Sequence, residues 1–109
     1  MKLALVIVQD TDAAALSKEL AKAGLASTRL ASSGGFLREG NTTLLIGVTD
    51  ERLTEVKRII KNTCQTRSRL ITPSPPLTGG PEDILSSPME VRVGGATLFV
   101  LDVVDFEKF

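Results

Sequence analysis

The sequence contains no histidine, tryptophan or tyrosine, and only one cysteine, Cys64. Histidine is the commonest general base near neutral pH and the commonest metal ligand, so its absence excludes Ser–His and Cys–His catalysis and histidine-based zinc sites. A single cysteine cannot form a disulfide within the chain. The carboxylates show no spacing that indicates a metal site or an acid–base pair. We therefore expect a protein that is not an enzyme and needs neither a metal nor a cofactor.

An excess of charge is missing as well, because 13 Lys+Arg are balanced by 13 Asp+Glu. A neutral chain has no global field to attract a nucleic acid polymer or an anionic membrane surface. The four aromatic residues, all phenylalanine, are too few for a platform on which a nucleic-acid strand could stack. The apolar run Leu3 to Val8 is too short to cross a membrane and lacks a signal cleavage pattern. We expect a cytoplasmic protein that binds neither a nucleic acid polymer nor a membrane.

The length of 109 residues predicts a single domain, because two separate cores in so short a chain would each be marginal. A repeat at a constant offset of 40 is visible within it. LVIVQD (Leu5 to Asp10) matches LIGVTD (Leu45 to Asp50), and Thr28 to Leu30 matches Ser68 to Leu70. Two copies are too few for a solenoid, so we expect one pseudo-symmetric domain in which each unit contributes a strand, a helix and an extended segment.

Each unit begins with a strand that is apolar on both faces, at residues 3–8 and 43–48, as expected of central strands. Asp10 or Thr11 is expected to cap the first helix and Gly24 to end it, before an exposed or edge strand at residues 25–33. Thr49 or Asp50 is expected to cap the second helix. The core stripe of this second helix is predicted at Leu53, Val56, Ile60 and Cys64, the last as a small buried hydrophobic residue.

The last third of the chain begins with a segment, residues 73–88, that holds all five prolines. Proline cannot occupy a central strand or a helix interior, so we expect a long and mobile surface loop. Residues 89–93 and 96–104 are predicted to be strands, joined as a tight hairpin by Gly94 and Gly95. We expect the C-terminal segment to be docked because it carries Phe106 and Phe109.

The densest local signal is SSGGFLREGNTT, residues 32–43. Gly34 and Gly35 allow a backbone nest for an anion such as phosphate, although an ordinary glycine turn in a hairpin is the simpler explanation of the pair taken alone. Phe36 and Leu37 at a turn have no core to enter, which favours a flat apolar ligand or a partner subunit as their cover. The side-chain amide of Asn41 can donate one hydrogen bond and accept another at the same time, as the N6/N7 edge of adenine requires.

Three runs together carry a resemblance: VQDTD, STRLASSGGFLREGNTTLLIG and MEVRVGGATLFVLDVVDFEKF. Nearly the whole chain is similar to the cyclic-di-AMP receptor family of PII-like signal transduction proteins. The resemblance implies an α+β fold, with a ferredoxin-like βαββαβ core, an extended loop and an added hairpin, over a single domain of residues 1–109. It also implies a homotrimer that binds the dinucleotide in clefts between subunits, flanked by a short loop at residues 34–40 and the long loop at 73–88.

The resemblance further implies the residues of the ligand site. Asn41 and the backbone of Gly47 would contact one adenine, and Phe99 would pack nearby. The chain departs from the family at Ala26, where an arginine is usual, at Lys108 in place of a glutamine, and at residues 84–87 in place of tyrosines. Arg29 or Lys108 is the candidate replacement for the missing charge. Phosphate and ribose would be held by Thr28, Gly35, Phe36 and Leu37.

The sequence thus predicts a non-catalytic receptor for cyclic di-AMP that relays binding through loop rearrangement to an unknown downstream protein. The alternative is a PII-like sensor of adenine mononucleotides such as ATP. It would have the same fold, and the departures from the family pattern would have changed which nucleotide the cleft binds.

Overall fold

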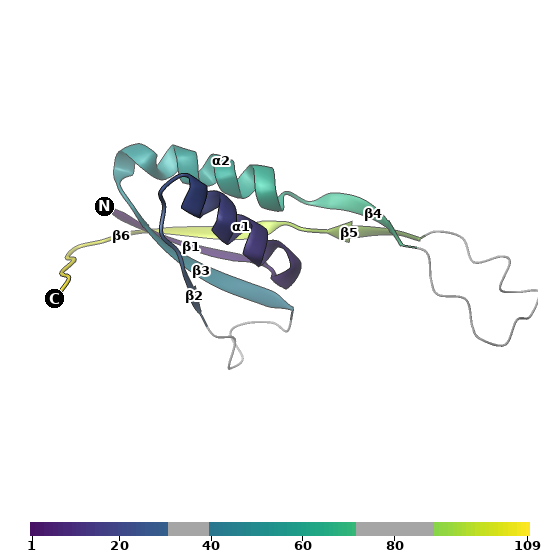
Figure 1. The fold of residues 1–109 in the computed structure, drawn as a ribbon, viewed down its shortest axis with the longest axis horizontal. Helices are drawn as coiled ribbons and strands as arrows, with labels where there is room; N and C mark the ends of the chain where they lie inside the picture. The colour runs from purple at the N-terminus through teal and green to yellow at the C-terminus, as the bar shows by residue number, and fades with distance from the viewer. Residues whose placement is uncertain (31–39, 72–88) are drawn as a thin grey trace, which may run out of the picture.

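The computed structural model describes residues 1–30, 40–71 and 89–109. A four-stranded antiparallel sheet with the strand order β2-β3-β1-β6 carries the fold (Figure 1). Helix α1 follows β1 and helix α2 follows β3, which gives the βαββαβ order of the ferredoxin-like fold once the additional strands β4 and β5 are set apart. The bounds are β1 (Lys2–Gln9), α1 (Asp10–Lys22), β2 (Thr28–Leu30), β3 (Asn41–Val48), α2 (Leu53–Cys64) and β6 (Ala96–Asp102).

The repeat at offset 40 corresponds to real structural units. Residues 5–9 lie in β1 and residues 45–48 in β3, and each strand leads into a helical segment. β1 and β3 pair with each other along their full length, from Lys2 opposite Val48 to Gln9 opposite Asn41. β1 is a central strand, as its two apolar faces predict, because β6 pairs along its other edge.

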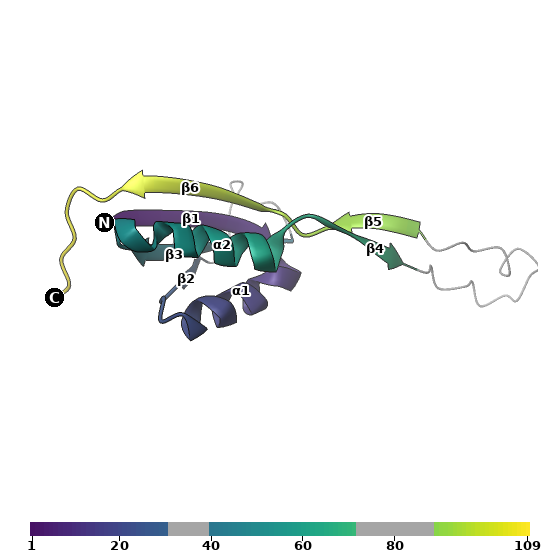
Figure 2. The same ribbon diagram turned by 90° about the horizontal axis from the view of Figure 1, so that it is seen from above.

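One face of the sheet holds the hydrophobic core. Both helices pack on this face, as the views in Figures 1 and 2 show. Alternate residues of β1 and β3 point toward the helices because successive side chains of a strand face opposite sides. Burial of each large apolar side chain stabilises the fold by roughly 1.5–3 kcal/mol. The largest fully buried side chains are Leu16, Leu20, Leu44, Ile46, Val6, Val8, Val56 and Cys64.

The opposite face of the sheet is also apolar, but neither helix covers it. Leu5 of β1 lies opposite Leu45 of β3 and opposite Phe99 of β6, and residues paired directly across strands share a face. Phe99 is 52% exposed, and Leu101, two residues further along the same strand, is 47% exposed. We call this surface the open face of the sheet.

The helix boundaries differ slightly from expectation. Gly24 has φ +75°, which confirms that the chain leaves α1 through a left-handed glycine. Gln9, rather than Asp10 or Thr11, occupies the position before α1, and its side chain makes no capping bond. Thr49 precedes a short 3₁₀ turn at Asp50–Arg52 that leads into α2, again without a side-chain cap.

The predicted hairpin through Gly94 and Gly95 is wrong in its pairing. β5 (Met89–Val93) pairs with β4 (Arg67–Ile71) in a separate two-stranded sheet, whereas β6 pairs with β1. Gly94 and Gly95, with φ +84° and +93°, therefore carry the chain from one sheet to the other. The β4–β5 pair, which we call the arm, projects beyond the main sheet (Figure 1). The predicted loop at residues 73–88 lies outside the described residues.

The Val103 N–H donates to the Met1 carbonyl at 3.3 Å, and the C-terminal residues 104–109 beyond it are exposed. Phe106 is 65% exposed and Phe109 is fully exposed, so the expected docking does not occur within one copy. Figure 2 shows this segment leaving the sheet at the end where the N-terminus lies.

Candidate functional site

The predicted site residues fall into two groups. Gly35, Phe36 and Leu37 lie in residues 31–39, outside the described residues. The others have defined positions: Thr28 and Arg29 on β2, Asn41 and Gly47 on β3, Phe99 on β6 and Lys108 in the C-terminal segment.

Thr28 and Phe99 belong to the same row of the open face. Thr28 of β2 pairs with Leu45 of β3. Leu45 also pairs with Leu5 of β1, and Leu5 pairs in turn with Phe99 of β6. This row crosses all four strands, so Thr28 and Phe99 are at opposite edges, about 14 Å apart at roughly 4.8 Å per strand. Arg29 instead shares the face of Leu44, where the helices pack, and is itself exposed.

Asn41 and Gly47 occupy opposite ends of β3. Gly47 is six positions further along the strand than Asn41, which corresponds to about 20 Å at roughly 3.3 Å per residue. Gly47 is exposed, and a side chain added there would meet no atom of the described residues within 4 Å, so there is open space on this face of the strand. Within a single copy, however, one adenine cannot contact both residues.

A cavity of about 360 Å³ lies at the Asn41 end of the sheet. It combines side-chain amides, hydroxyls and apolar groups from the ends of the three strands β1, β3 and β6 and from the connections at Thr66 and Gly94–Gly95. Asn41 lies directly opposite Gln9 in the register, which brings the two amide side chains side by side. The lining residues are Ile7, Val8, Gln9, Asn41, Thr66, Gly94, Gly95, Ala96 and Thr97.

The arm is attached to the body beside this cavity. The Gly94 N–H donates to Gln9 Oε1 at 2.8 Å, and the Gly95 N–H donates to the Cys64 carbonyl. Arg67, the first residue of β4, donates to the buried carboxylate of Asp12 at 2.8 Å. That hydrogen bond raises the pKa of Arg67 above its usual value. A movement of the arm would therefore change contacts at the cavity wall.

Gly94 also has little space around it. A Cβ built at this glycine would lie 2.5 Å from Arg67 Nη1 and 2.7 Å from the Gln65 carbonyl oxygen. Together with its positive φ, this close approach explains why glycine is required where the chain passes from the arm to the sheet.

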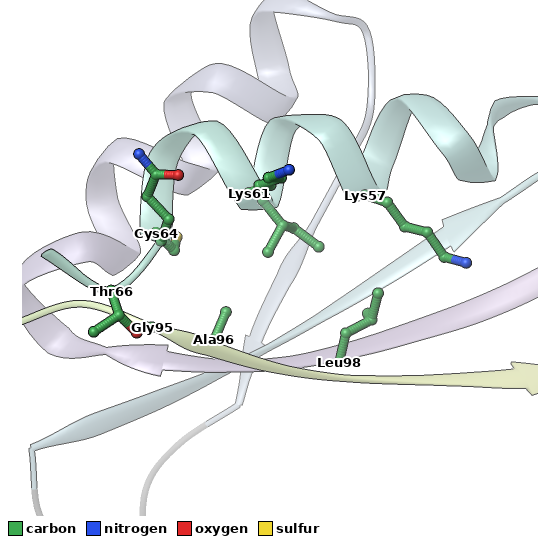
Figure 3. A pocket seen from close by; sticks show the side chains of 9 residues that line it. Lys57, Lys61, Cys64, Thr66, Gly95, Ala96 and Leu98 are labelled. Carbon is green, nitrogen blue, oxygen red and sulfur yellow. The ribbon is translucent and has the colours of Figure 1, made fainter.

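A second cavity of about 300 Å³ lies between α2 and β6 (Figure 3). Lys57 and Lys61 project from the helix above Ala96 and Leu98 of β6. Cys64, at the end of this helix, is fully buried as predicted, and burial raises the pKa of its thiol to about 11. The thiol is therefore protonated near neutral pH and does not supply a nucleophile.

The carboxylates mostly have structural partners. Asp10 accepts a hydrogen bond from Thr42, and Asp102 pairs with Lys2, which lowers the pKa of Asp102. Within residues 1–30, 40–71 and 89–109, no three histidine, cysteine or acidic residues gather as a metal site would require. In the same residues, no helix has the length and hydropathy needed to span a membrane.

Gln9 and Thr97 line the Asn41 cavity but were not predicted from the sequence. Gln9 ends the apolar strand of the first repeat and belongs to the VQDTD run of the family resemblance, but neither signal assigns it a ligand contact. Their proximity to Asn41 depends on the register between distant strands, which no local pattern specifies.

The comparisons with known proteins agree with the fold. A crystal structure described as that of a functionally unknown protein from Pediococcus pentosaceus ATCC 25745 is 42% identical, over 99% of this chain and 96% of that one, with a TM-score of 0.79. The model of the cyclic-di-AMP receptor family matches residues 1–109, the whole chain. The chain therefore belongs to the cyclic-di-AMP receptor family.

Proposed function

We propose that this protein is a non-catalytic signalling receptor that binds cyclic di-AMP in clefts between the subunits of a homotrimer. The observation that carries this proposal is the match of the cyclic-di-AMP receptor family to all 109 residues. The amides and hydroxyls of the Asn41 cavity support it, because they can recognise a base edge without carrying out a reaction.

The separation of the candidate residues favours a site shared between copies. Thr28 and Phe99 lie at opposite edges of the open face, and Asn41 and Gly47 at opposite ends of β3. A dinucleotide has two bases, so Asn41 and Gly47 can each serve a different base. Association through the open face would place the β6 edge of one copy, with Phe99, next to the β2 edge of another.

The open face also supplies the driving force for assembly. Phe99 and Leu101 expose about half of their surface, next to the partly buried Leu3, Leu5 and Leu45. A contiguous apolar surface of this kind marks an interaction site in a small protein. Burial of the open face between copies would stabilise the trimer. The same surfaces would form the walls of the clefts between subunits.

The anionic phosphates need local partners because the chain has no net charge. We assign this role to the Thr28 hydroxyl, to Arg29 or Lys108, and to residues 35–37, as the family resemblance implies. The relay to a downstream protein would use the two loops at residues 34–40 and 73–88. The arm, whose attachment adjoins the Asn41 cavity, is the described element that leads to the longer loop.

Isothermal titration calorimetry of the full-length protein with cyclic di-AMP and, separately, with ATP tests the proposal. We expect saturable binding of cyclic di-AMP with one ligand per chain, and much weaker binding of ATP. Tighter binding of ATP would instead identify a mononucleotide sensor. A lack of binding by either nucleotide would refute a role as an adenine nucleotide receptor.

A further inference from the structure

Gln9 occupies a position that links the Asn41 cavity to the arm. It is the last residue of β1, it lies opposite Asn41, and it is one of the residues that line the cavity. The same side chain accepts a hydrogen bond from the backbone N–H of Gly94, at the point where the arm joins β6. The VQDTD run that carries the family resemblance includes this residue, but the resemblance assigns it no ligand contact.

The Gly94 bond fixes which end of the Gln9 amide is free. A backbone N–H can only donate, so the side-chain atom that it contacts at 2.8 Å must be the carbonyl oxygen Oε1. The amide nitrogen Nε2 is thereby directed away from Gly94 with two N–H groups to donate. Gln9 thus offers donors, whereas the neighbouring Asn41 can both donate and accept.

The surroundings of these amides suit a base better than a phosphate. The described residues lining the cavity include the apolar Ile7, Val8 and Ala96, and none of them is cationic. A phosphate would need a positive partner in such a position, whereas an adenine ring presents apolar faces and nitrogen acceptors at its edge.

We infer that Gln9 is a specificity-determining residue of the cyclic di-AMP site, donating from Nε2 to a ring nitrogen of one adenine while its Oε1 holds the arm through Gly94. This inference rests on the proposed function. A ligand that binds Nε2 also holds Oε1 in place, because both atoms belong to the same planar amide group. The hydrogen bond from Gly94 to Oε1 would then be held in place as well. Ligand binding should therefore slow hydrogen exchange at the Gly94 amide.

Two substitutions at this position separate the two contacts. Gln9→Glu keeps oxygen atoms that can accept from Gly94 but removes the N–H donors. Gln9→Met has a similar length and removes both the donors and the acceptor. Thr11→Glu is the matched control for charge, because Thr11 is exposed, lies two residues away and does not line the Asn41 cavity.

Calorimetry with cyclic di-AMP and amide exchange followed by NMR provide the readouts. We expect Gln9→Glu to bind at least tenfold more weakly than both the parent and Thr11→Glu, with Gly94 exchange in the ligand-free protein unchanged. Gln9→Met should weaken binding similarly and also accelerate Gly94 exchange. In the parent, saturating ligand should slow that exchange severalfold.

The outcomes distinguish this inference from the proposed function. If the parent binds cyclic di-AMP but Gln9→Glu binds within twofold of Thr11→Glu, the donor role is wrong and the proposed function stands. If Gln9→Met leaves Gly94 exchange unchanged, the link to the arm is wrong. If the parent itself does not bind, the proposed function fails and the ligand contact of Gln9 fails with it.

Discussion

At the scale of single residues, Asn41 gives the most direct test of where the ligand binds. Its amide lies on the cavity wall at the end of β3, and it is not part of the buried core. We predict that Asn41→Ala weakens cyclic di-AMP binding by about 1–3 kcal/mol, the cost of losing a paired contact to a base. Calorimetry measures this loss, and circular dichroism should show unchanged folding.

The comparison variant for Asn41 is Arg38→Ala, within the short loop that lies outside the described residues. We expect it to weaken binding much less, because the sequence predicts Arg38 in a surface turn, where a charge contributes only a screened interaction. Parent-like binding by Asn41→Ala would show that the adenine does not occupy this cavity.

Ala26 allows a gain-of-binding experiment. It is exposed and lies two residues before Thr28, so a longer side chain fits there without displacing the core. The family resemblance implies an arginine at this position, where a charge-assisted hydrogen bond to a phosphate contributes about 1.5–3 kcal/mol. We predict that Ala26→Arg tightens cyclic di-AMP binding by this amount and that the gain shrinks as salt is raised. Weaker binding would place the phosphates elsewhere.

At the scale of secondary-structure elements, Arg52 connects the two helices. It donates to the carboxylate of Glu55 at 3.0 and 3.1 Å and to the carbonyl of Ala23, just after α1, at 2.6 Å. The hydrogen bond from Arg52 lowers the pKa of Glu55 below its usual value. Both side chains are partly solvent-exposed, so we expect a small and salt-sensitive effect on stability.

The sign of the pH dependence follows from that lowered pKa. The interaction stabilises the fold fully above the unfolded-state pKa of glutamate, near ~4.3, and is lost as pH falls through the lower native pKa. Urea unfolding midpoints between pH 6 and pH 3 should therefore fall more steeply for the parent than for Glu55→Gln. Arg52→Met should show the same shallower fall. Parallel profiles for all three proteins would show that this pair contributes nothing.

Sequence patterns predicted the elements well, because their signals are local. Of the predicted helical stripe, Val56, Ile60 and Cys64 are buried and Leu53 is partly buried against the core, and Gly24 ends α1 with a positive φ. The glycine pair at residues 94–95 was misassigned, because positive φ angles serve a hairpin turn and a crossing between two sheets equally well. Only the competing partners, β4 for β5 and β1 for β6, decide between them.

At the scale of the whole molecule, the open face predicts self-association. Leu101 is 47% exposed on β6, so replacing it should not disturb the core of one copy. We predict that the parent is a trimer by light scattering, at about three chain masses, and that Leu101→Lys dissociates it by placing a charge in an apolar contact.

Thr54→Lys provides the control for Leu101→Lys. It adds the same charge at an exposed position of α2, on the side of the molecule away from the open face. This variant should remain a trimer. A parent that is monomeric at micromolar concentration, or a Leu101→Lys protein that stays trimeric, would rule out assembly through the open face.

The sequence by itself determined the α+β class, the strand and helix of each related unit, and the buried stripe of α2, because these follow from composition and from periodicities within one element. Tertiary structure decided the register that sets Gln9 beside Asn41, the packing of both helices on one face, and the separation of Asn41 from Gly47. The physical reason is that strand pairing joins residues far apart in the chain. Its outcome depends on the packing of the whole sheet rather than on any local pattern.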